Sequence, residues 1–170
     1  MSLSLIANWK LNGSKEFNYH WALEFFRNFN GNNYSSIGIA PASLYIDHLK
    51  SVLADYDIKV GSQNIDMEQT GARTGEISAS MIKDLGCAFS IVGHSERRIL
   101  FHETNQMICQ KLIQANNHSL IPILCIGESA DENQSNSTYK VLEEQIIEAL
   151  GEANELSSLI IAYEPVWAIG

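Results

Sequence analysis

Glu164 is a carboxylate placed where an enzyme could use it as a general base. It follows the apolar run 159–162 and precedes Pro165, which cannot extend a strand ladder. A single acid at the end of a buried strand, followed by a loop, is a suitable position for a proton acceptor. The alternative interpretation of Glu164 is an ion-paired carboxylate at a strand end.

His94 is the second residue whose position indicates chemistry. It follows Gly93 and precedes Ser95, which could cap a short helix. The positive end of a helix dipole disfavours an imidazolium, and a neutral imidazole can donate a hydrogen bond to a carbonyl group. The alternative is a core histidine bonded to the backbone. We expect no catalytic role for the other histidines, which lie in or beside predicted helices: His20, His48, His102 and His118.

Lys10 could supply a fixed cation beside these two groups. Asn8 and Lys10 alternate along the first predicted strand, so both side chains can point into one pocket. A carboxylate base, a neutral electrophile and a cation are together suited to proton transfer next to a carbonyl in a small anionic substrate. The alternative for Lys10 is a surface lysine. We expect Glu96, Arg97 and Arg98 to form ion pairs that orient Lys10 and His94.

Six short apolar segments must position these residues. They are strands predicted at 4–9, 36–40, 58–64, 88–92, 120–126 and 159–164. These segments are almost continuously apolar and alternate with helical segments, which predicts a parallel sheet covered by helices.

The spacing of apolar residues and the positions of capping residues predict the buried faces and the first residues of the helices. Phe17, Trp21, Phe25 and Phe29 stand four residues apart, which predicts one apolar helical face. Helix caps are predicted at Ser14, Ser43, Ser78, Ser95 and Thr104. We expect Met81 to face the core, and we expect residues 131–137 to form a polar loop.

Two architectures fit this alternation: a closed (β/α)₈ barrel and an open doubly wound sheet. No G-x-G-x-x-G pattern follows the first strand, which disfavours a dinucleotide-binding sheet. A doubly wound sheet binds ligands at one switch point, whereas a barrel collects functional groups after many strands. Polar residues after most strands therefore favour the barrel: Lys10, Gln63, Asn64, His94, Glu128 and Glu164. We predict one domain over residues 1–170.

Composition restricts the partners and the compartment. The net charge of −9 makes nucleic acid and anionic membranes poor partners. Cys87, Cys109 and Cys125 form no C-x-x-C pair and no metal-ligand spacing, so we expect buried free thiols in a reducing cytoplasm. The first residues lack the basic region of a signal peptide, and no apolar run approaches the length of a membrane span.

Four motifs, in order along the chain, closely resemble the triosephosphate isomerase family: residues 8–13, 92–98, 125–128 and 162–170. Residues 70–76 resemble the dimer loop of that family. The resemblance implies a TIM barrel, of which this chain covers about the first six βα units. It also implies an enzyme of glycolysis and gluconeogenesis that interconverts dihydroxyacetone phosphate and D-glyceraldehyde 3-phosphate through an enediol(ate), without cofactor or metal.

The resemblance assigns a role to each residue that matches a motif. Glu164 would move the proton, His94 would act as neutral electrophile and relay, and Lys10 would stabilise negative charge. Asn8 would hydrogen-bond the substrate, and Glu96 would support the site from behind.

The resemblance also implies a lid over the site, a homodimer and a longer chain. Gly170 would offer a backbone N–H to the substrate phosphate, residues 165–167 would begin a lid, and Thr74 would enter the neighbouring subunit of a homodimer. Chains of this fold run to roughly 250 residues, whereas this sequence stops at Gly170, inside the lid. This sequence is therefore expected to be part of a longer isomerase chain. The alternatives are an inactive barrel fragment and a non-catalytic interaction protein.

Overall fold

A curved sheet of six parallel strands forms the centre of the computed structural model, which describes residues 4–29, 36–153 and 155–168. The strands pair in chain order, each with the next. They are β1 (Ser4–Asn8), β2 (Ser36–Ala40), β3 (Ile58–Ser62), β4 (Phe89–Val92), β5 (Ile121–Ile126) and β6 (Ile160–Tyr163). A doubly wound sheet would reverse its order at a switch point, so the sequential order excludes that alternative and shows a half-barrel.

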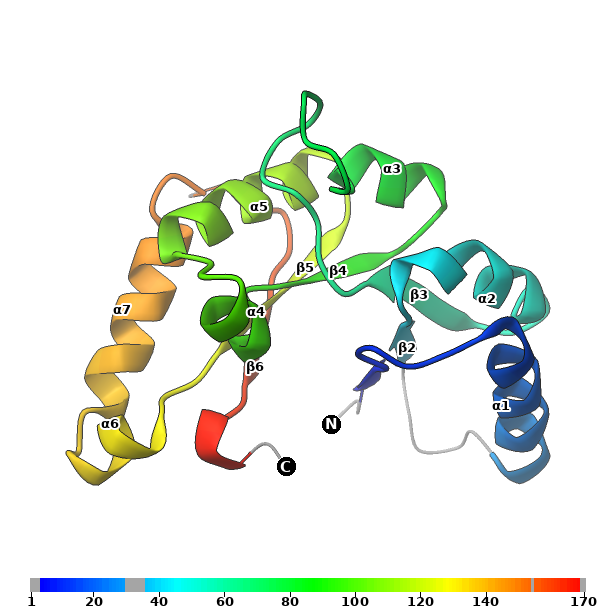
Figure 1. Cartoon of the computed structure of the whole chain (residues 1–170), viewed down its shortest axis with the longest axis horizontal. Helices are drawn as coiled ribbons and strands as arrows, with labels where there is room; N and C mark the ends of the chain where they lie inside the picture. The colour runs from blue at the N-terminus through cyan, green and yellow to red at the C-terminus, as the bar shows by residue number, and fades with distance from the viewer. Residues whose placement is uncertain (1–3, 30–35, 154, 169–170) are drawn as a thin grey trace.

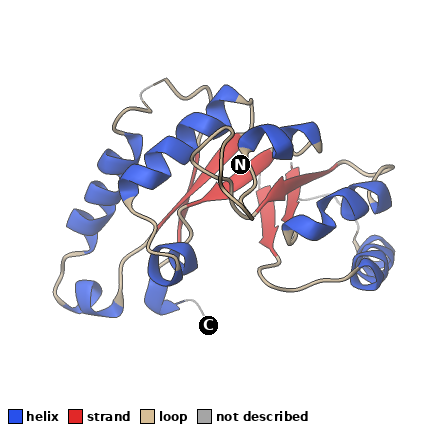
Figure 2. Ribbon diagram, turned by 45° about the horizontal axis from the view of Figure 1, so that its top comes forward, coloured by secondary structure: helices blue, strands red, loops and turns tan. Residues whose placement is uncertain are grey.

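Helices cover the outer side of this sheet. In Figure 1, α1, α2, α3, α5 and α7 follow one another around an arch of strands. Figure 2 shows the helices lying along the outer side of the strands. The α-helices are α1 (Lys15–Asn28), α2 (Ile46–Val52), α3 (Ala79–Asp84), α4 (Ser95–Leu100), α5 (Asn105–Asn117), α6 (Ala130–Gln134) and α7 (Thr138–Leu150). Two 3₁₀ turns are η1 (Ser43–Tyr45) and η2 (Val166–Ala168).

Both faces of the sheet carry apolar side chains, which explains the continuous apolar strands. The larger buried cluster packs helices on strands and includes Ile39, Leu49, Ile82, Leu112 and Leu124. A smaller cluster contains Ala40, Phe89, Ile91, Ile123 and Cys125.

The glycines of β2 and β3 make room for Phe89. A Cβ added to Gly61 would overlap the Phe89 ring, and one added to Gly38 would lie 2.9 Å from the ring atom Cε1. We therefore expect Gly61→Ala to lower the free energy of unfolding by about 1–3 kcal/mol, the usual range for overpacking. Urea unfolding measures this loss. In Gly61→Ala/Phe89→Leu the loss should be smaller than the sum of the two single effects, and strict additivity would contradict the explanation.

The aromatic face of α1 is confirmed as a row of ring contacts. Trp21 and Phe25 stack with centroids 4.7 Å apart, and Phe25 and Phe29 stack at 4.6 Å. Trp9 meets Phe17 edge-on at 5.1 Å. Because Trp9 precedes Lys10, this row packs α1 against the chain segment that carries the candidate cation.

Several local predictions are confirmed and four are wrong. Ser14, Ser78 and Thr104 cap their helices as predicted. Ser43 makes no capping hydrogen bond because it starts the 3₁₀ turn η1, and Ser95 lies inside α4, whose cap is His94. Met81 is exposed because the buried face of α3 is formed by Ala79 and Ile82, and the helical turn directs Met81 away from that face. Residues 131–137 contain most of α6, because Ser129 and Glu132 form a capping box that starts a helix.

The three cysteines are free and buried, as predicted. Within the described ranges of the chain, no helix is long and apolar enough to cross a membrane.

Candidate active site

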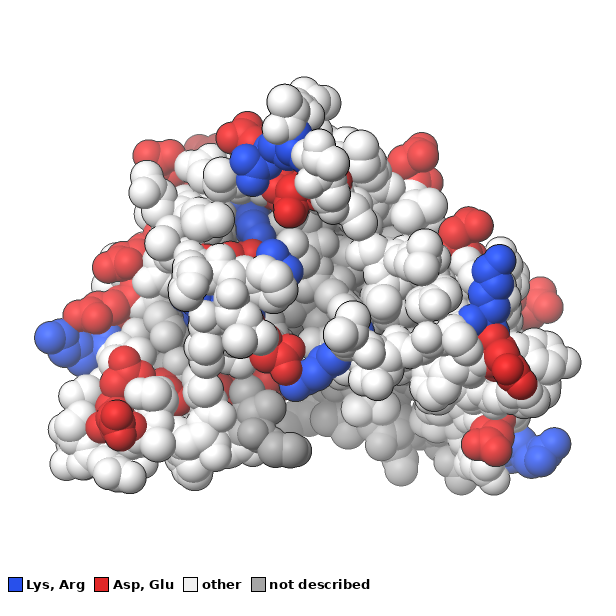
Figure 3. All heavy atoms as spheres, in the orientation of Figure 1, with Lys and Arg blue, Asp and Glu red and all other residues white. Residues whose placement is uncertain are grey.

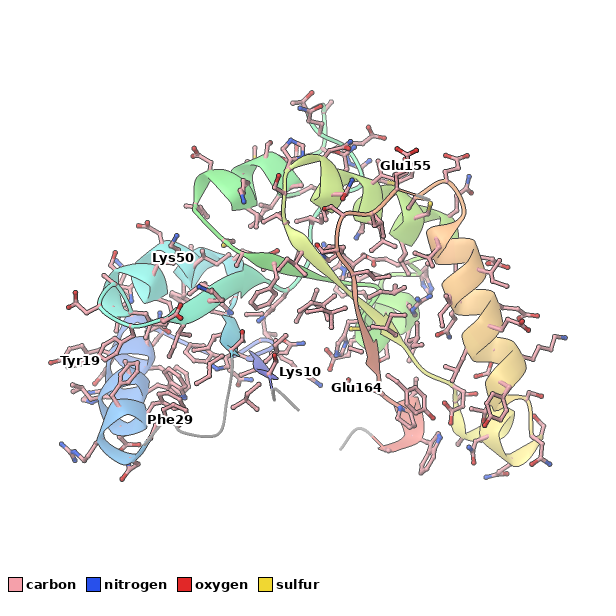
Figure 4. The ribbon with its side chains drawn as sticks, turned by 180° about the vertical axis from the view of Figure 1, so that it is seen from behind. Lys10, Tyr19, Phe29, Lys50, Glu155 and Glu164 are labelled. Atoms are coloured by element: carbon pink, nitrogen blue, oxygen red, sulfur yellow. The ribbon has the colours of Figure 1, made fainter. Side chains whose placement is uncertain are left out.

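The predicted site residues meet at the carboxyl ends of the strands. A cavity of about 540 Å³ is lined by Asn8, Lys10, His94 and Glu164, together with apolar side chains from the inner face of the sheet. Lys10 follows β1 and Glu164 follows β6, so they come from the two edge strands. Figure 4 shows them on the same side of the sheet. A larger neighbouring cavity of about 710 Å³ also contains Asn8, Lys10 and His94 but does not contain Glu164.

His94 is held so that one ring nitrogen faces Glu164. Its Nδ1 accepts a hydrogen bond from the backbone N–H of Glu96 at 3.2 Å, which places the ring proton of a neutral imidazole on Nε2. Nε2 lies 3.9 Å from the Glu164 Oε2 atom. This separation is too long for a direct hydrogen bond, so the two groups can both face a substrate atom. His94 is buried, which restricts the ring to this orientation.

The residues that follow Ser95 connect the site to the sheet. Glu96 accepts a hydrogen bond from Lys10 Nζ at 2.9 Å and lies 3.5 Å from His94 Nδ1. Arg98 donates to the carbonyl oxygens of Gly93 at 2.8 Å and Cys125 at 3.2 Å, which ties the ends of β4 and β5 together. Glu96 therefore contacts Lys10 and His94, whereas Arg97 pairs with Glu103 and Arg98 bonds carbonyl and amide oxygens rather than a carboxylate.

Lys10 adopts an unusual backbone conformation. Its φ of 51° lies in the left-handed region, which few residues other than glycine adopt. Its N–H donates to Asn8 Oδ1 at 2.9 Å, so the Asn8 side chain fixes the backbone of Lys10. Gln63 donates from Nε2 to the carbonyl oxygen of Lys10 at 2.9 Å. From the sequence, Gln63 is identified only as a polar residue at the end of a strand. Its contact with Lys10 was not predicted, because nothing in the local sequence pattern indicates so distant a partner.

The backbone of Glu164 packs closely on Gly127. A Cβ added to Gly127 would overlap the carbonyl oxygen of Glu164, so only glycine fits at that position. Gln145 of α7 holds Gly127 in place by accepting its N–H at 2.9 Å and donating to its carbonyl oxygen at 3.0 Å. The Glu164 N–H continues the ladder to Ile126 at 2.9 Å. The carboxylate therefore projects from a fixed strand end, although its side chain is 54% exposed.

Cys125 lies beside this carboxylate and stays protonated. Burial, together with the charge of Glu164, raises the pKa of the Cys125 thiol to about 12. Cys125 therefore offers neither a nucleophile nor a second base at neutral pH.

Glu128 anchors the segment that follows Glu164. Its buried carboxylate accepts hydrogen bonds from Trp167 Nε1 at 3.0 Å, Tyr163 O–H at 3.2 Å and Asn133 Nδ2 at 3.1 Å. Burial alone would raise the pKa of Glu128, but these hydrogen bonds outweigh it and lower the pKa from its ordinary value of 4.5. The start of the predicted lid is thus fastened as the 3₁₀ turn η2.

The lowered pKa of Glu128 predicts a loss of stability in acid. A carboxylate with a lowered folded-state pKa stabilises the fold above its unfolded pKa, and this contribution disappears as the pH falls through the folded pKa. Urea unfolding from about pH 6 to about pH 3 should therefore show a steeper loss for the wild type than for Glu128→Gln, which cannot ionise. At neutral pH the variant should be the less stable of the two. Equal pH dependence in both proteins would contradict this account.

Charge is distributed unevenly between the surface and the site. Acidic side chains are scattered over the face shown in Figure 3 and are not gathered into one patch. Among the described residues that line the 540 Å³ cavity, Lys10 is the only lysine or arginine. An anionic ligand in this cavity would therefore pair with Lys10, although the chain as a whole carries a net charge of −9 that repels anions.

Two further residues belong to the predicted site. Gly170, predicted to contact phosphate, lies outside the described residues. Thr74 is exposed on the loop between β3 and α3, which projects from the arch in Figure 1. The Arg73 Nε atom lies 2.7 Å from Asp66 Oδ1, which fastens this loop at its base. The contact of Thr74 with a second subunit stays a prediction.

Comparisons with known proteins agree with this geometry. The sequence model of the family described as "Triosephosphate isomerase" matches residues 3–170. The chain is 46% identical to triosephosphate isomerase of Blochmanniella floridana, over 99% of this chain and 67% of that protein. It is 43% identical to the enzyme of Dictyoglomus thermophilum, over 98% of this chain and 68% of that protein.

A solved structure has the same fold. The crystal structure of triosephosphate isomerase from Bartonella henselae aligns with a TM-score of 0.88 at 30% identity, over 98% of this chain and 69% of that one. The chain thus spans about two thirds of the length of these relatives. The six-stranded half-barrel, the ordered site motifs and the match over residues 3–170 show that the chain belongs to the triosephosphate isomerase family.

Proposed function

We propose that this protein interconverts dihydroxyacetone phosphate and D-glyceraldehyde 3-phosphate by proton transfer through an enediol(ate). One observation carries the proposal: His94 Nε2 and Glu164 Oε2 face each other at 3.9 Å in a cavity that also holds Lys10. Family membership supports the choice of a phosphorylated triose as substrate.

Glu164 and His94 divide the proton transfers between them. The Glu164 carboxylate removes a proton from the carbon next to the substrate carbonyl, while His94 Nε2–H donates a hydrogen bond to the carbonyl oxygen. Electrons from the broken C–H bond form the carbon–carbon double bond of the enediol(ate). His94 relays a proton between its two oxygens, and Glu164 returns a proton to the adjacent carbon. The base and the relay both end in their starting forms, so no cofactor or metal is needed.

Lys10, Asn8 and Glu96 serve binding and charge. The Lys10 ammonium pairs with the anionic substrate and stabilises negative charge that develops on the enediolate oxygen. Asn8 lines the same cavity and hydrogen-bonds the substrate. Glu96 holds Lys10 Nζ at 2.9 Å, and so supports the cation without taking part in the proton transfer. The backbone N–H of Gly170 is proposed to bind the phosphate.

We also propose a homodimer of a cytoplasmic enzyme that acts in glycolysis and gluconeogenesis. The exposed Thr74 loop is the proposed contact, and it borders a groove of about 710 Å³ that includes Gly75, Glu76 and Ile77. Sedimentation equilibrium should give twice the chain mass. A monomer at all concentrations would remove the dimer from the proposal.

An enzyme assay tests the proposed function. Protein made from the complete reading frame containing this sequence is given glyceraldehyde 3-phosphate, and a coupling dehydrogenase then reduces any dihydroxyacetone phosphate that forms. The proposal expects turnover that needs no added metal or cofactor beyond the coupling reagents. Absence of turnover by folded protein would instead support the non-catalytic alternative.

A further inference from the structure

We propose that Gln63 is a positioning residue that holds Lys10 in the conformation in which its ammonium group faces the substrate cavity. The inference rests on the proposed function, because it concerns the binding of the substrate anion by Lys10. Gln63 directly follows the residue that ends β3. Its side-chain Nε2 donates to the carbonyl oxygens of Lys10 and Ala40, each at 2.9 Å.

Gln63 continues the pairing of β1 with β2 where the backbone ladder stops. The last backbone contact between these strand ends runs from the Trp9 N–H to the Ala40 oxygen at 3.0 Å. The Gln63 amide then connects that same oxygen to the carbonyl of Lys10, one residue further along. Gln63 therefore fixes the direction of the peptide group that follows Lys10.

Lys10 needs such a contact because its backbone is strained. A φ of 51° in a residue other than glycine persists only where the surroundings over-determine it. Asn8 Oδ1 holds the Lys10 N–H and Glu96 holds Nζ, each at 2.9 Å, but neither contact restrains the carbonyl. The next residue, Leu11, is 97% exposed, so packing does not restrain it either.

The strand end that carries Gln63 is itself anchored. The neighbouring Asn64 accepts a hydrogen bond through Oδ1 from Lys111 Nζ at 2.7 Å. Lys111 lies on α5, is only 3% exposed and also pairs with the buried Glu103. Because this network connects the end of β3 to α5, Gln63 acts from a fixed base rather than from a mobile loop.

Removal of the Gln63 amide should release Lys10. Two carbonyl oxygens would lose a hydrogen-bond donor, and Lys10 could relax to a negative φ that turns its side chain away from the cavity. We expect about tenfold weaker binding of an anion at Lys10, since the loss of a hydrogen-bond donor to buried and half-buried carbonyl oxygens has effects of this order.

The test compares Gln63→Met with a matched control in protein from the complete reading frame. Methionine has a similar length but offers no donor. Asn116→Leu is the control because Asn116 is half-buried, also bonds backbone groups through its amide, and lies at the opposite end of the strands. The one-bond Cα–Hα coupling of Lys10 distinguishes positive from negative φ. Titration with inorganic phosphate gives the anion dissociation constant.

The proposal expects Gln63→Met to move the Lys10 coupling to a negative-φ value and to raise the phosphate dissociation constant about tenfold. Asn116→Leu should change neither quantity. If Gln63→Met does not fold, Gln63→Asn serves, because it keeps an uncharged amide but is one methylene group shorter and cannot bond both carbonyl oxygens as Gln63 does. Unchanged Lys10 coupling and phosphate affinity in the folded variant would overturn the proposal.

The same experiment separates this inference from the proposed function. If the wild type neither binds phosphate nor isomerises the triose, the function fails, while the Lys10 coupling still decides whether Gln63 sets the backbone. If the wild type is active and the coupling does not respond to the variant, the function stands and the role of Gln63 is wrong.

Discussion

Glu164→Gln should reduce kcat about 10²–10⁴-fold, the range typical for the loss of a general base. Glutamine keeps the shape of the side chain but cannot accept the proton from carbon. The Glu164 backbone is held by Ile126 and Gly127 whatever the side chain, so the fold should not change. The measurement is kcat in the coupled assay, with the urea midpoint recorded for both proteins.

The control for Glu164→Gln is the same substitution at an exposed carboxylate. Glu155 lies in a surface segment away from the cavity, as Figure 4 shows. Glu155→Gln should keep wild-type turnover. Wild-type turnover in Glu164→Gln would remove Glu164 as the base, and a large fall in both variants would indicate a general effect of charge.

Lys10→Met should lower kcat/KM about 10²–10³-fold, as expected when a group that stabilises transition-state charge is removed. KM for the phosphorylated substrate should rise as well, because Lys10 is the only lysine or arginine among the described residues lining the cavity. Stability should change by less than about 1 kcal/mol, since the Lys10–Glu96 pair is partly exposed. Steady-state kinetics and urea unfolding measure the two effects.

Lys59→Met is the matched control for this charge deletion. Lys59 pairs with Asp57 at 2.7 Å on the exposed surface, outside the cavity that contains Glu164. The control should keep wild-type kinetics. If Lys10→Met also kept its kcat/KM and KM, the cation would have no part in substrate binding or in charge stabilisation.

The architecture could be predicted because the residues that determine each strand and helix lie close together in the sequence. Buried parallel strands need continuous apolar runs, and short connections with intervening helices place each strand beside the next. His94, Lys10 and Glu164 were predictable for the same reason, since each follows such a run. Their convergence then follows from parallel strands, whose carboxyl ends share one edge of the sheet.

The failures occur where a choice depends on a backbone angle or a distant partner. His94 precedes α4 and Ser95 is its first residue, and only the backbone conformation decides that the imidazole is the cap. The capping box of Ser129 and Glu132 could be read from the sequence, but it begins two residues before the segment interpreted as a loop and ends inside it. The contacts of Gln63 connect it to residues 53 and 23 positions away, for which a local pattern has no signal.

Isomerisation in deuterium oxide tests the central claim most directly. Dihydroxyacetone phosphate is incubated with protein from the complete reading frame, and the glyceraldehyde 3-phosphate product is examined by NMR. Proton transfer through Glu164 predicts deuterium at the carbon next to the carbonyl, because a proton held on a half-exposed carboxylate exchanges with solvent. Product that carries no deuterium would indicate direct hydride transfer between the carbons, and it would contradict the assignment of Glu164 as the base.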